Sequence, residues 1–487
     1  MADLGFWKLA QQDPDHLALV EPDGTEHTAG ELLAACNQVA HGLRAAGVGK
    51  GDTVAGLLHN FAPFMELYLG AMQIGAYLVP INWHLAPPEI QYIVEDSESK
   101  VFVDSHDALD KLKSGQPTTL PEDRTAGAVM NYTSGTTGRP KGVRRPLVDL
   151  DPDTNAELHT FLLNLFEIEA HNNGVHLVAA PLYHTAVLNF GSASLNMGHT
   201  LVLLDKWTPE DTLDRIDRYK VTTSHMVPTM FHRLLALPEE TKQKYDVSSL
   251  RQVIHSAAPC PIDVKRRMLE WWGPTIWEYY AATEGGGTVV NPEEWLQKPG
   301  TVGKPWPISE VKIFDDEGNE LPAGQIGTVY MKMGDISFEY HGDEEKTKKS
   351  WRNGFFTVGD AGELDEDGWL FLRDRKSDMI ISGGVNIYPA EIEGELLTHP
   401  KVGDAAVFGI PDEDWGEQIK AVVEPGDGVE PGPQLEQELI AFLQERIAKY
   451  KIPKSVDFVA ELPRDPNGKL YKRKLRDPYW EGKERQI

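Results

Sequence analysis

The stretch YTSGTTGRPKG, residues 132–142, gathers four hydroxyl side chains besides tyrosine, three glycines and one lysine. Backbone N–H groups of a glycine-rich turn converge on phosphate oxygens, hydroxyls add hydrogen-bond donors, and a lysine adds a mobile positive charge. The loop therefore suits a polyphosphate. It is not a Walker loop, because Gly138 is followed by Arg139 and Pro140 before Lys141. A polar surface turn is the alternative interpretation of this composition.

The stretches around this loop alternate between helix and strand patterns. Residues 28–50 form an amphipathic helical pattern that ends in glycine, and residues 53–60 follow as a strand. The alternation continues through residues 62–82 and 200–228. Strands that alternate with helices predict parallel sheets covered by helices. Short strands and turns then dominate from about residue 300.

The last part of the chain has the pattern of a small α+β domain. We place the boundary at the residues around Arg375, which predicts two domains, residues 1–376 and 377–487. Within the second, residues 449–476 carry nine basic and three acidic side chains. This local excess of positive charge suits an anionic ligand, although ordinary solvated lysines would give the same composition.

The whole chain is strongly acidic, with 47 Lys and Arg against 75 Asp and Glu and a net charge of −28. This charge argues against nucleic acid or an anionic membrane as a general partner. Only Cys36 and Cys260 are present, too few for a disulfide framework. The polar N-terminus and the lack of a run of about 18 apolar residues predict a cytoplasmic protein with no signal peptide and no membrane span.

Several motifs together resemble the adenylate-forming (AMP-binding) enzyme superfamily, in particular its acyl-CoA synthetase and fatty-acid–CoA ligase branch. The loop at 132–142 is similar to the family's phosphate-binding loop. The other matching stretches follow in the family's order and extend the resemblance over nearly the whole chain: PLYHTA (181–186), HSAAP (255–259), YYAATEGG (279–286), VGD (358–360), DRKSDMIISGGVNIYPAEIE (374–393) and LPRDPNGKLYKRKLR (462–476).

The resemblance implies both a fold and a two-step reaction. The fold is α/β, with a large N-terminal domain of layered βαβαβ subdomains plus a β-rich subdomain, and a small mobile α+β C-terminal domain. The expected co-substrates are ATP and coenzyme A, with Mg²⁺ as the metal. A carboxylic acid would first be joined to AMP with release of pyrophosphate, which turns its oxygen into a phosphate leaving group. The acyl group would then pass to the thiol of coenzyme A.

The resemblance also implies roles for residues in the first step. Lys469 would bridge the carboxylate and the α-phosphate, Thr283 would hydrogen-bond the α-phosphate, and Glu284 would bind Mg²⁺. Asp360 and Arg375 would hold the ribose. The β,γ-phosphates would be held by Thr133, Ser134, Gly135, Thr136, Thr137, Gly138 and Lys141. The purine would lie among Ala257, Ala258, Pro259, Tyr279, Tyr280 and Ala281, with Tyr280 stacked on the ring.

Some positions depart from the family pattern. Ala281 stands where the family has glycine, Val358 stands for threonine, and Asp374 stands for the glycine before the hinge arginine. The adenine turn, often Gly-Gly-Ala-Pro in the family, begins Ser256-Ala257 here. None of these changes removes a charged group that the chemistry needs.

The second step would use residues of the C-terminal domain. After adenylation the family rotates this domain about a hinge, which is Ser377 or Asp378 here, so that Lys469 leaves the site. The residues expected to contact coenzyme A are Ser382, Gly383, Gly384, Lys449 and Lys451. His184 could orient the thiol and the carboxylate, and a histidine of the core is the equally weighted alternative.

The acyl pocket would be lined by four segments beside the motifs: residues 186–198, 224–230, 257–260 and 284–290. They are apolar, small or weakly polar, which predicts an uncharged substrate tail because a buried charge without a partner is costly. Gly285, Gly286 and Gly287 suggest space for a long or bulky acid, such as a medium- or long-chain fatty, aryl or steroid-like one.

Two other functions fit the same residues less well. An acyl-AMP ligase would pass its product to a carrier protein instead of coenzyme A. A nucleotide-binding protein that has lost catalysis would not need Lys469, Glu284, Asp360 and Arg375, all of which are retained. The small-molecule acid, ATP and coenzyme A are therefore the expected partners, and the sequence leaves a homodimer open.

Overall fold

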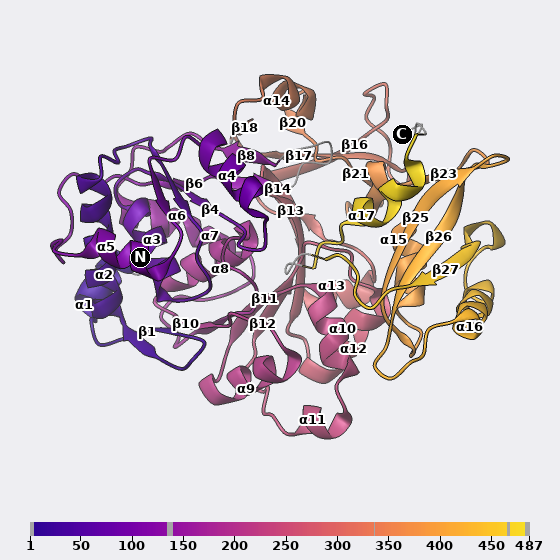
Figure 1. The fold of residues 1–487 in the computed structure, drawn as a ribbon, viewed down its shortest axis with the longest axis horizontal. Coiled ribbons are helices and arrows are strands. Elements are labelled where there is room, and N and C mark those ends of the chain that lie inside the picture. Colours follow the sequence, from indigo (N-terminus) through magenta and orange to yellow (C-terminus); the bar gives the residue numbers. More distant parts are fainter. Residues whose placement is uncertain (1–3, 134–139, 336, 465–467, 483–487) are drawn as a thin grey trace. The chain divides into compact units, whose positions relative to one another are not determined.

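The computed structural model describes residues 4–133, 140–335, 337–464 and 468–482. The chain forms two compact α/β units, coloured along the sequence in Figure 1, and each takes segments from several parts of the chain. This division differs from the predicted boundary at residue 376, which stays a prediction. Unit 1 consists of Met1–Met226, Pro238–Ile254 and Asp335–Lys349, and unit 2 of Val227–Leu237, His255–Gly334 and Ser350–Ile487.

One sheet of unit 1 is fully parallel, in the order β5-β3-β4-β6. Its strands are β3 (Thr53–Gly56), β4 (Tyr77–Pro80), β5 (Val101–Val103) and β6 (Ala128–Val129). The helix α2 (Ala29–Ala45) begins with a capping box between Thr28 and Glu31, and α3 (Ala62–Met72) is buried along almost its whole length. The expected βα alternation in this region is confirmed.

A second sheet of unit 1 contains β2-β1-β10-β9-β11, all parallel except β1 with β2. The helix α8 (Thr185–Asn196) packs on β9 and β10, and α9 (Pro209–Tyr219) packs on β9. Residues 186–198, predicted to line the acyl pocket, thus belong mostly to a largely buried helix. The strands are β1 (Leu17–Val20), β2 (Glu26–Thr28), β9 (Val175–Val178), β10 (Thr200–Leu203) and β11 (Thr223–Met226).

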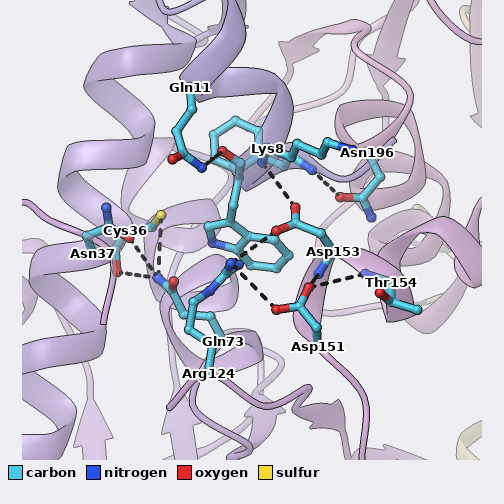
Figure 2. A network of polar contacts seen from close by, with 12 residues as sticks. Lys8, Gln11, Cys36, Asn37, Gln73, Arg124, Asp151, Asp153, Thr154 and Asn196 are labelled. Atoms are coloured by element: carbon cyan, nitrogen blue, oxygen red, sulfur yellow. Dashed lines mark hydrogen bonds and ion pairs between the residues drawn. The ribbon is translucent and has the colours of Figure 1, made fainter. Parts of the chain in front are cut away.

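A polar network fixes the first helix, α1 (Phe6–Gln12), to the rest of unit 1 (Figure 2). Asp153 accepts hydrogen bonds from the Lys8 backbone N–H at 3.1 Å and from Arg124 at 3.0 Å. The Arg124 guanidinium also lies 5.2 Å from the ring centroid of Trp7. Because Arg124 and Trp7 are shielded from water, these contacts hold α1 more firmly than exposed ones would.

Unit 2 contains three groups of strands. The first is antiparallel, β13 (Ile276–Ala282), β14 (Gly285–Val290) and β15 (Lys304–Pro305). The second is the β-rich part, in which β17 pairs with β16, β20 and β21. Its strands are β16 (Ser309–Phe314), β17 (Gly327–Met333), β19 (Trp351–Arg352), β20 (Phe355–Phe356), β21 (Asp360–Leu364) and β22 (Leu370–Arg375).

The third group is the predicted α+β domain, drawn in orange to yellow in Figure 1. Its core joins both long strands to a helix through buried side chains such as Val407, Ala421 and Leu439. The α+β character expected for the end of the chain is confirmed. Its elements are β23 (Ile380–Ser382), β24 (Val385–Ile387), α15 (Pro389–Leu396), β25 (Val402–Asp412), β26 (Gly416–Pro425), α16 (Pro433–Gln444), β27 (Ser455–Phe458) and α17 (Lys472–Arg476).

In the described part of the chain, no helix is both long and apolar enough to cross a lipid bilayer.

Candidate active site

The β13–β14 hairpin presents the residues of the YYAATEGG motif. Tyr280 pairs with Thr288, and the register shifts by one residue between Ala281 and Ala282. This bulge leaves Thr283 and Glu284 as the two turn residues. The Glu284 carboxyl group is buried, although the hairpin end is a turn. The end of β13 and the turn after it therefore carry Tyr280 and Thr283, which are predicted to contact the purine and the α-phosphate. Glu284, the predicted Mg²⁺ ligand, follows directly.

At Gly286 and Gly287, two of the three glycines after Glu284, the structure leaves no open space for a Cβ, contrary to our expectation. A Cβ at Gly287 would lie 2.4 Å from the Tyr280 carbonyl oxygen and 2.7 Å from the Trp306 ring. A Cβ at Gly286, whose φ is 72°, would lie 3.1 Å from Met331. The glycines allow the hairpin backbone to pack closely against its neighbours, so they do not bear on substrate size.

Tyr280, Asp360 and Arg375 form one cluster from three strands of unit 2. The Tyr280 hydroxyl donates to Asp360 at 2.7 Å, and the Arg375 Nε lies 3.7 Å from the other oxygen of that carboxylate. Asp360 and Arg375 are directly opposed on β21 and β22, which fixes their distance. Burial and the charge of Asp360 raise the pKa of Tyr280 well above its usual value, so the hydroxyl remains a donor. A ribose hydroxyl would share Asp360 with this tyrosine.

The predicted adenine turn is strained at Ala257. Its φ is 73°, in the left-handed region that favours glycine, at the position where the family often has glycine. Ala257 and Pro259 are exposed, while Ala258 is partly buried. Left-handed non-glycine residues often mark ligand sites, where surrounding structure holds them in place.

Replacing Ala257 with glycine is expected to raise the free energy of unfolding by about 0.5–1 kcal/mol, because the left-handed strain exceeds the extra flexibility of unfolded glycine. Ala258→Gly is the matched control, since Ala258 does not have a positive φ. It should lower stability by about 0.4–1 kcal/mol. Urea unfolding of both variants measures the difference, and equal shifts in the same direction would contradict the strain.

The elements that follow this turn in sequence form a buried ion pair, which the sequence analysis did not predict. The Lys265 ammonium contacts the Glu278 carboxylate at 2.7 Å, with His255 Nε2 at 3.5 Å from the same oxygen. Lys265 is 0% exposed and Glu278 is 6% exposed. Burial lowers the pKa of Lys265 and raises that of Glu278. The pair joins α12 (Ile262–Trp272), which follows the turn, to β13, which carries Tyr280.

The loop that carries Lys469 packs on a helix start within unit 2. Arg464 donates to the Gly468 carbonyl oxygen at 2.6 Å. A Cβ at Gly468 would lie 2.9 Å from the Thr229 hydroxyl and 3.1 Å from Val227, at the beginning of α10 (Pro228–Ala236). Lys469 itself is partly buried. Val227 and Thr229, which belong to a segment predicted to line the acyl pocket, therefore lie beside Gly468, the residue before the predicted catalytic lysine.

The predicted coenzyme A loop is a tight hairpin. Ser382 pairs with Val385, and Gly383 and Gly384 between them have φ values of 58° and 79°. Two consecutive positive φ values are the geometry of a type I′ turn, which explains the Gly-Gly sequence. The Gly383 N–H donates to the carbonyl oxygen of Trp415 at 2.8 Å, and the Trp415 side chain is 57% exposed.

The two lysines predicted to bind coenzyme A differ in their surroundings. The Lys451 ammonium contacts both oxygens of Glu391 at 2.6 Å. It would have to release this carboxylate to bind a phosphate. Lys449 is exposed. Its role, like the other roles assigned from the motifs, stays a prediction.

Part of the predicted phosphate loop lies outside the described residues: Ser134, Gly135, Thr136, Thr137 and Gly138. The strands on either side, β7 (Asn131–Thr133) and β8 (Lys141–Arg144), pair antiparallel, which brings the backbones of Thr133 and Lys141 opposite each other. The structure thus defines the two ends of the phosphate loop.

His184 is the residue before α8, and its ring lies 4.3 Å from that of Tyr183.

Glu284 fits a magnesium ion held mainly by a nucleotide. No group of three or more His, Cys, Asp or Glu side chains within the described ranges could hold a metal ion. Mg²⁺ commonly takes one or two carboxylates together with substrate phosphates and water, so a single buried carboxylate is compatible with it. Coordination would then require ATP to be bound.

Comparisons with known proteins agree with these motifs. The model of the AMP-binding enzyme family matches residues 6–340, and that of the AMP-binding enzyme C-terminal domain matches residues 391–469. A feruloyl-CoA synthase from Amycolatopsis sp. is 35% identical over 97% of this chain and 98% of its own. A fatty acid–[acyl-carrier-protein] ligase from Streptomyces coeruleorubidus is 32% identical over 98% of this chain and 96% of its own.

Among solved structures, an o-succinylbenzoate CoA synthetase from Bacillus subtilis, in complex with its acyl-adenylate intermediate, is similar with a TM-score of 0.82. It is 32% identical and covers 97% of this chain and 98% of its own. Fold, motif order and both matched domains therefore agree over nearly the whole length. The chain belongs to the AMP-binding enzyme family and, within it, to the adenylate-forming acyl-CoA synthetases.

Proposed function

We propose that this protein is an ATP-dependent ligase that joins a hydrophobic carboxylic acid to coenzyme A through an acyl adenylate. The observation that carries the proposal is the contact of Tyr280 with Asp360 beside Arg375, which gathers an aromatic ring, a carboxylate and a guanidinium at the predicted nucleoside site. ATP, coenzyme A and an uncharged-tailed acid are the proposed substrates.

In the first step a carboxylate oxygen attacks the α-phosphorus of ATP, and the bond to pyrophosphate breaks. Two anions must approach each other, so donors and cations have to be in place before the reaction. Lys469 supplies a positive charge to both anions, and Thr283 donates to the α-phosphate. Mg²⁺ held by Glu284 and the phosphates would neutralise charge on the departing pyrophosphate.

In the second step the thiol of coenzyme A loses its proton to solvent, its sulfur attacks the acyl carbon, and AMP leaves with the electrons of the acyl–phosphate bond. The phosphate of AMP is a good leaving group, so this step needs alignment more than strong catalysis. The type I′ hairpin of Ser382–Val385 is the proposed support for the pantetheine arm. His184 is proposed to orient the reacting groups.

The proposed acid has an uncharged tail. Residues 186–198 carry no charged side chain, and His225 in the adjacent segment is fully buried. Burial lowers the pKa of His225 to about 3, so this ring is neutral at physiological pH. A charged tail in these surroundings would be costly without a partner. The relatives named for feruloyl and fatty-acyl groups support an aryl or fatty acid with an uncharged tail, whereas the o-succinylbenzoate of the third relative keeps a second carboxylate.

Transfer to a carrier protein is the second candidate, favoured by the similarity to the fatty acid–[acyl-carrier-protein] ligase. The test measures pyrophosphate release with ATP, Mg²⁺ and a panel of fatty, aryl and steroid-type acids, each with and without coenzyme A. Sustained turnover that requires coenzyme A supports the proposal and identifies the acid. A single burst unaffected by coenzyme A, followed by turnover with a carrier protein, would favour the second candidate.

The proposal also includes a location in the cell and an oligomeric state. A cytoplasmic location agrees with two cysteines that form no disulfide in the structure, Cys36 and Cys260. Size-exclusion chromatography with light scattering would distinguish a monomer from a homodimer.

A further inference from the structure

We infer that Asp374 is a positioning residue for Lys469: it holds the C-terminal domain in the orientation that favours adenylation over thioester formation. This inference rests on the proposed function, because it concerns the balance between the two proposed steps. Asp374 lies at the end of β22, before the predicted hinge residues, which form a single turn of 3₁₀ helix at Lys376–Asp378.

Asp374 caps a helix that lies beyond the hinge. The helix α15 begins after Tyr388, whose side chain makes no capping hydrogen bond. The Ala390 backbone N–H instead donates to the Asp374 carboxylate at 2.9 Å. A carboxylate at a helix N-terminus satisfies an otherwise unused donor and interacts favourably with the helix dipole. The contact therefore links the chain before the hinge to the chain after it.

The charge of Asp374 also acts on the segment that carries the predicted catalytic lysine. Lys472, three residues after Lys469, is buried and contacts Glu393 at 2.8 Å. Burial alone would lower the pKa of Lys472, but Glu393, Asp374 and Asp378 raise it, so the ammonium keeps its charge. The Lys472 ammonium thus interacts with carboxylates on both sides of the hinge.

These contacts would respond differently to rotation about the hinge. Glu393 and Lys472 both lie after the hinge and move together. Asp378 is one of the two predicted hinge residues, and its carboxylate lies 3.6 Å from Arg476. Asp374 lies before the hinge, so its hydrogen bond with Ala390 must break when the domain turns, and its attraction to the Lys472 ammonium must change. In the orientation that these contacts hold, the Gly468–Lys469 loop packs on Val227 and Thr229. Asp374 therefore stabilises the orientation that presents Lys469.

The test compares the two half-reactions in full-length Asp374→Ala. With an acid that the wild type accepts, the rate of ATP–pyrophosphate exchange should fall about tenfold, the size expected for losing a hydrogen bond to a charged group. The rate at which coenzyme A consumes the pre-formed acyl adenylate should be unchanged or higher. Asp374→Asn should recover part of the exchange rate, because its amide oxygen can still accept from Ala390.

Asp151→Ala is the matched control. Asp151 caps α6 (Pro152–His159), which has eight residues like α15, but lies far from the hinge in sequence. It should leave the ratio of the two rates unchanged. Equal losses in both half-reactions of Asp374→Ala, or an equal change of the ratio in Asp151→Ala, would overturn the inference. If Asp374→Ala does not fold, the same comparison applies to Asp374→Asn. A wild type that adenylates no acid would instead overturn the proposed function.

Discussion

Lys469→Ala is expected to lower the rate of acyl-adenylate formation by about 10²–10³-fold, the cost of removing one preorganised group that stabilises transition-state charge. ATP–pyrophosphate exchange with an accepted acid measures this rate. The transfer of a pre-formed acyl adenylate to coenzyme A should change much less, because the proposed second step uses other residues. A larger loss in the rate of adenylation than in the rate of transfer to coenzyme A would assign Lys469 to the first step.

A neighbouring lysine provides the control for this variant. Lys474 lies in the same basic run but is exposed, and its ammonium lies 5.1 Å from the ring centroid of Tyr471. Lys474→Ala should change either rate by no more than about twofold, as for most surface substitutions. Equal losses in both half-reactions of Lys469→Ala would contradict a role confined to adenylation, and a comparable loss in Lys474→Ala would indicate a general effect of charge.

Lys265→Met is expected to lower the free energy of unfolding by about 3–5 kcal/mol, because it leaves the Glu278 carboxylate buried without its ammonium partner. Replacing both residues, Lys265→Met with Glu278→Met, should recover most of the loss, since an apolar pair needs no charge compensation. Urea unfolding of the two single variants and the double variant gives the coupling energy. Additive losses would show that the two charges do not depend on each other.

The loss in Lys265→Met should also depend on pH. Burial raises the pKa of Glu278 in the folded protein, and removing Lys265 would raise it further. A group with a raised folded pKa stabilises most below its unfolded pKa and loses that contribution as pH rises. The deficit relative to wild type should therefore shrink as pH falls from about 8 towards about 5. A deficit independent of pH would contradict the assignment of the charge to Glu278.

Local patterns predicted the parts of the structure that depend on nearby residues. The alternation in residues 28–82 predicted a parallel sheet with covering helices, and this sheet is present. These features follow from periodicity, which a short stretch of sequence contains. The fold of the whole chain was predicted from the resemblance of its motifs to those of the family.

Contacts between distant residues could not be found in this way. Tyr280 and Asp360 are 80 residues apart, and only the folded hairpin and sheet bring them to 2.7 Å. Lys265 is followed by two arginines in an amphipathic helix, so composition alone does not indicate which cation is buried. The sequence also did not indicate which residues lie beside Gly287 in the fold. The space that we expected there is occupied by Trp306.

The interleaved composition of the two units has a consequence for synthesis of the chain. Unit 1 takes its last segment from Asp335–Lys349, and unit 2 takes its first from Val227–Leu237. Ribosomes add about 5–20 residues per second, and domains generally fold as units once their residues are available. Unit 1 therefore cannot be completed until residue 349 has left the ribosome, by which time the first two segments of unit 2, Val227–Leu237 and His255–Gly334, have also been made. A nascent chain halted near residue 254 would lack β18 (Glu339–Tyr340), the partner of β8, and would expose that strand edge.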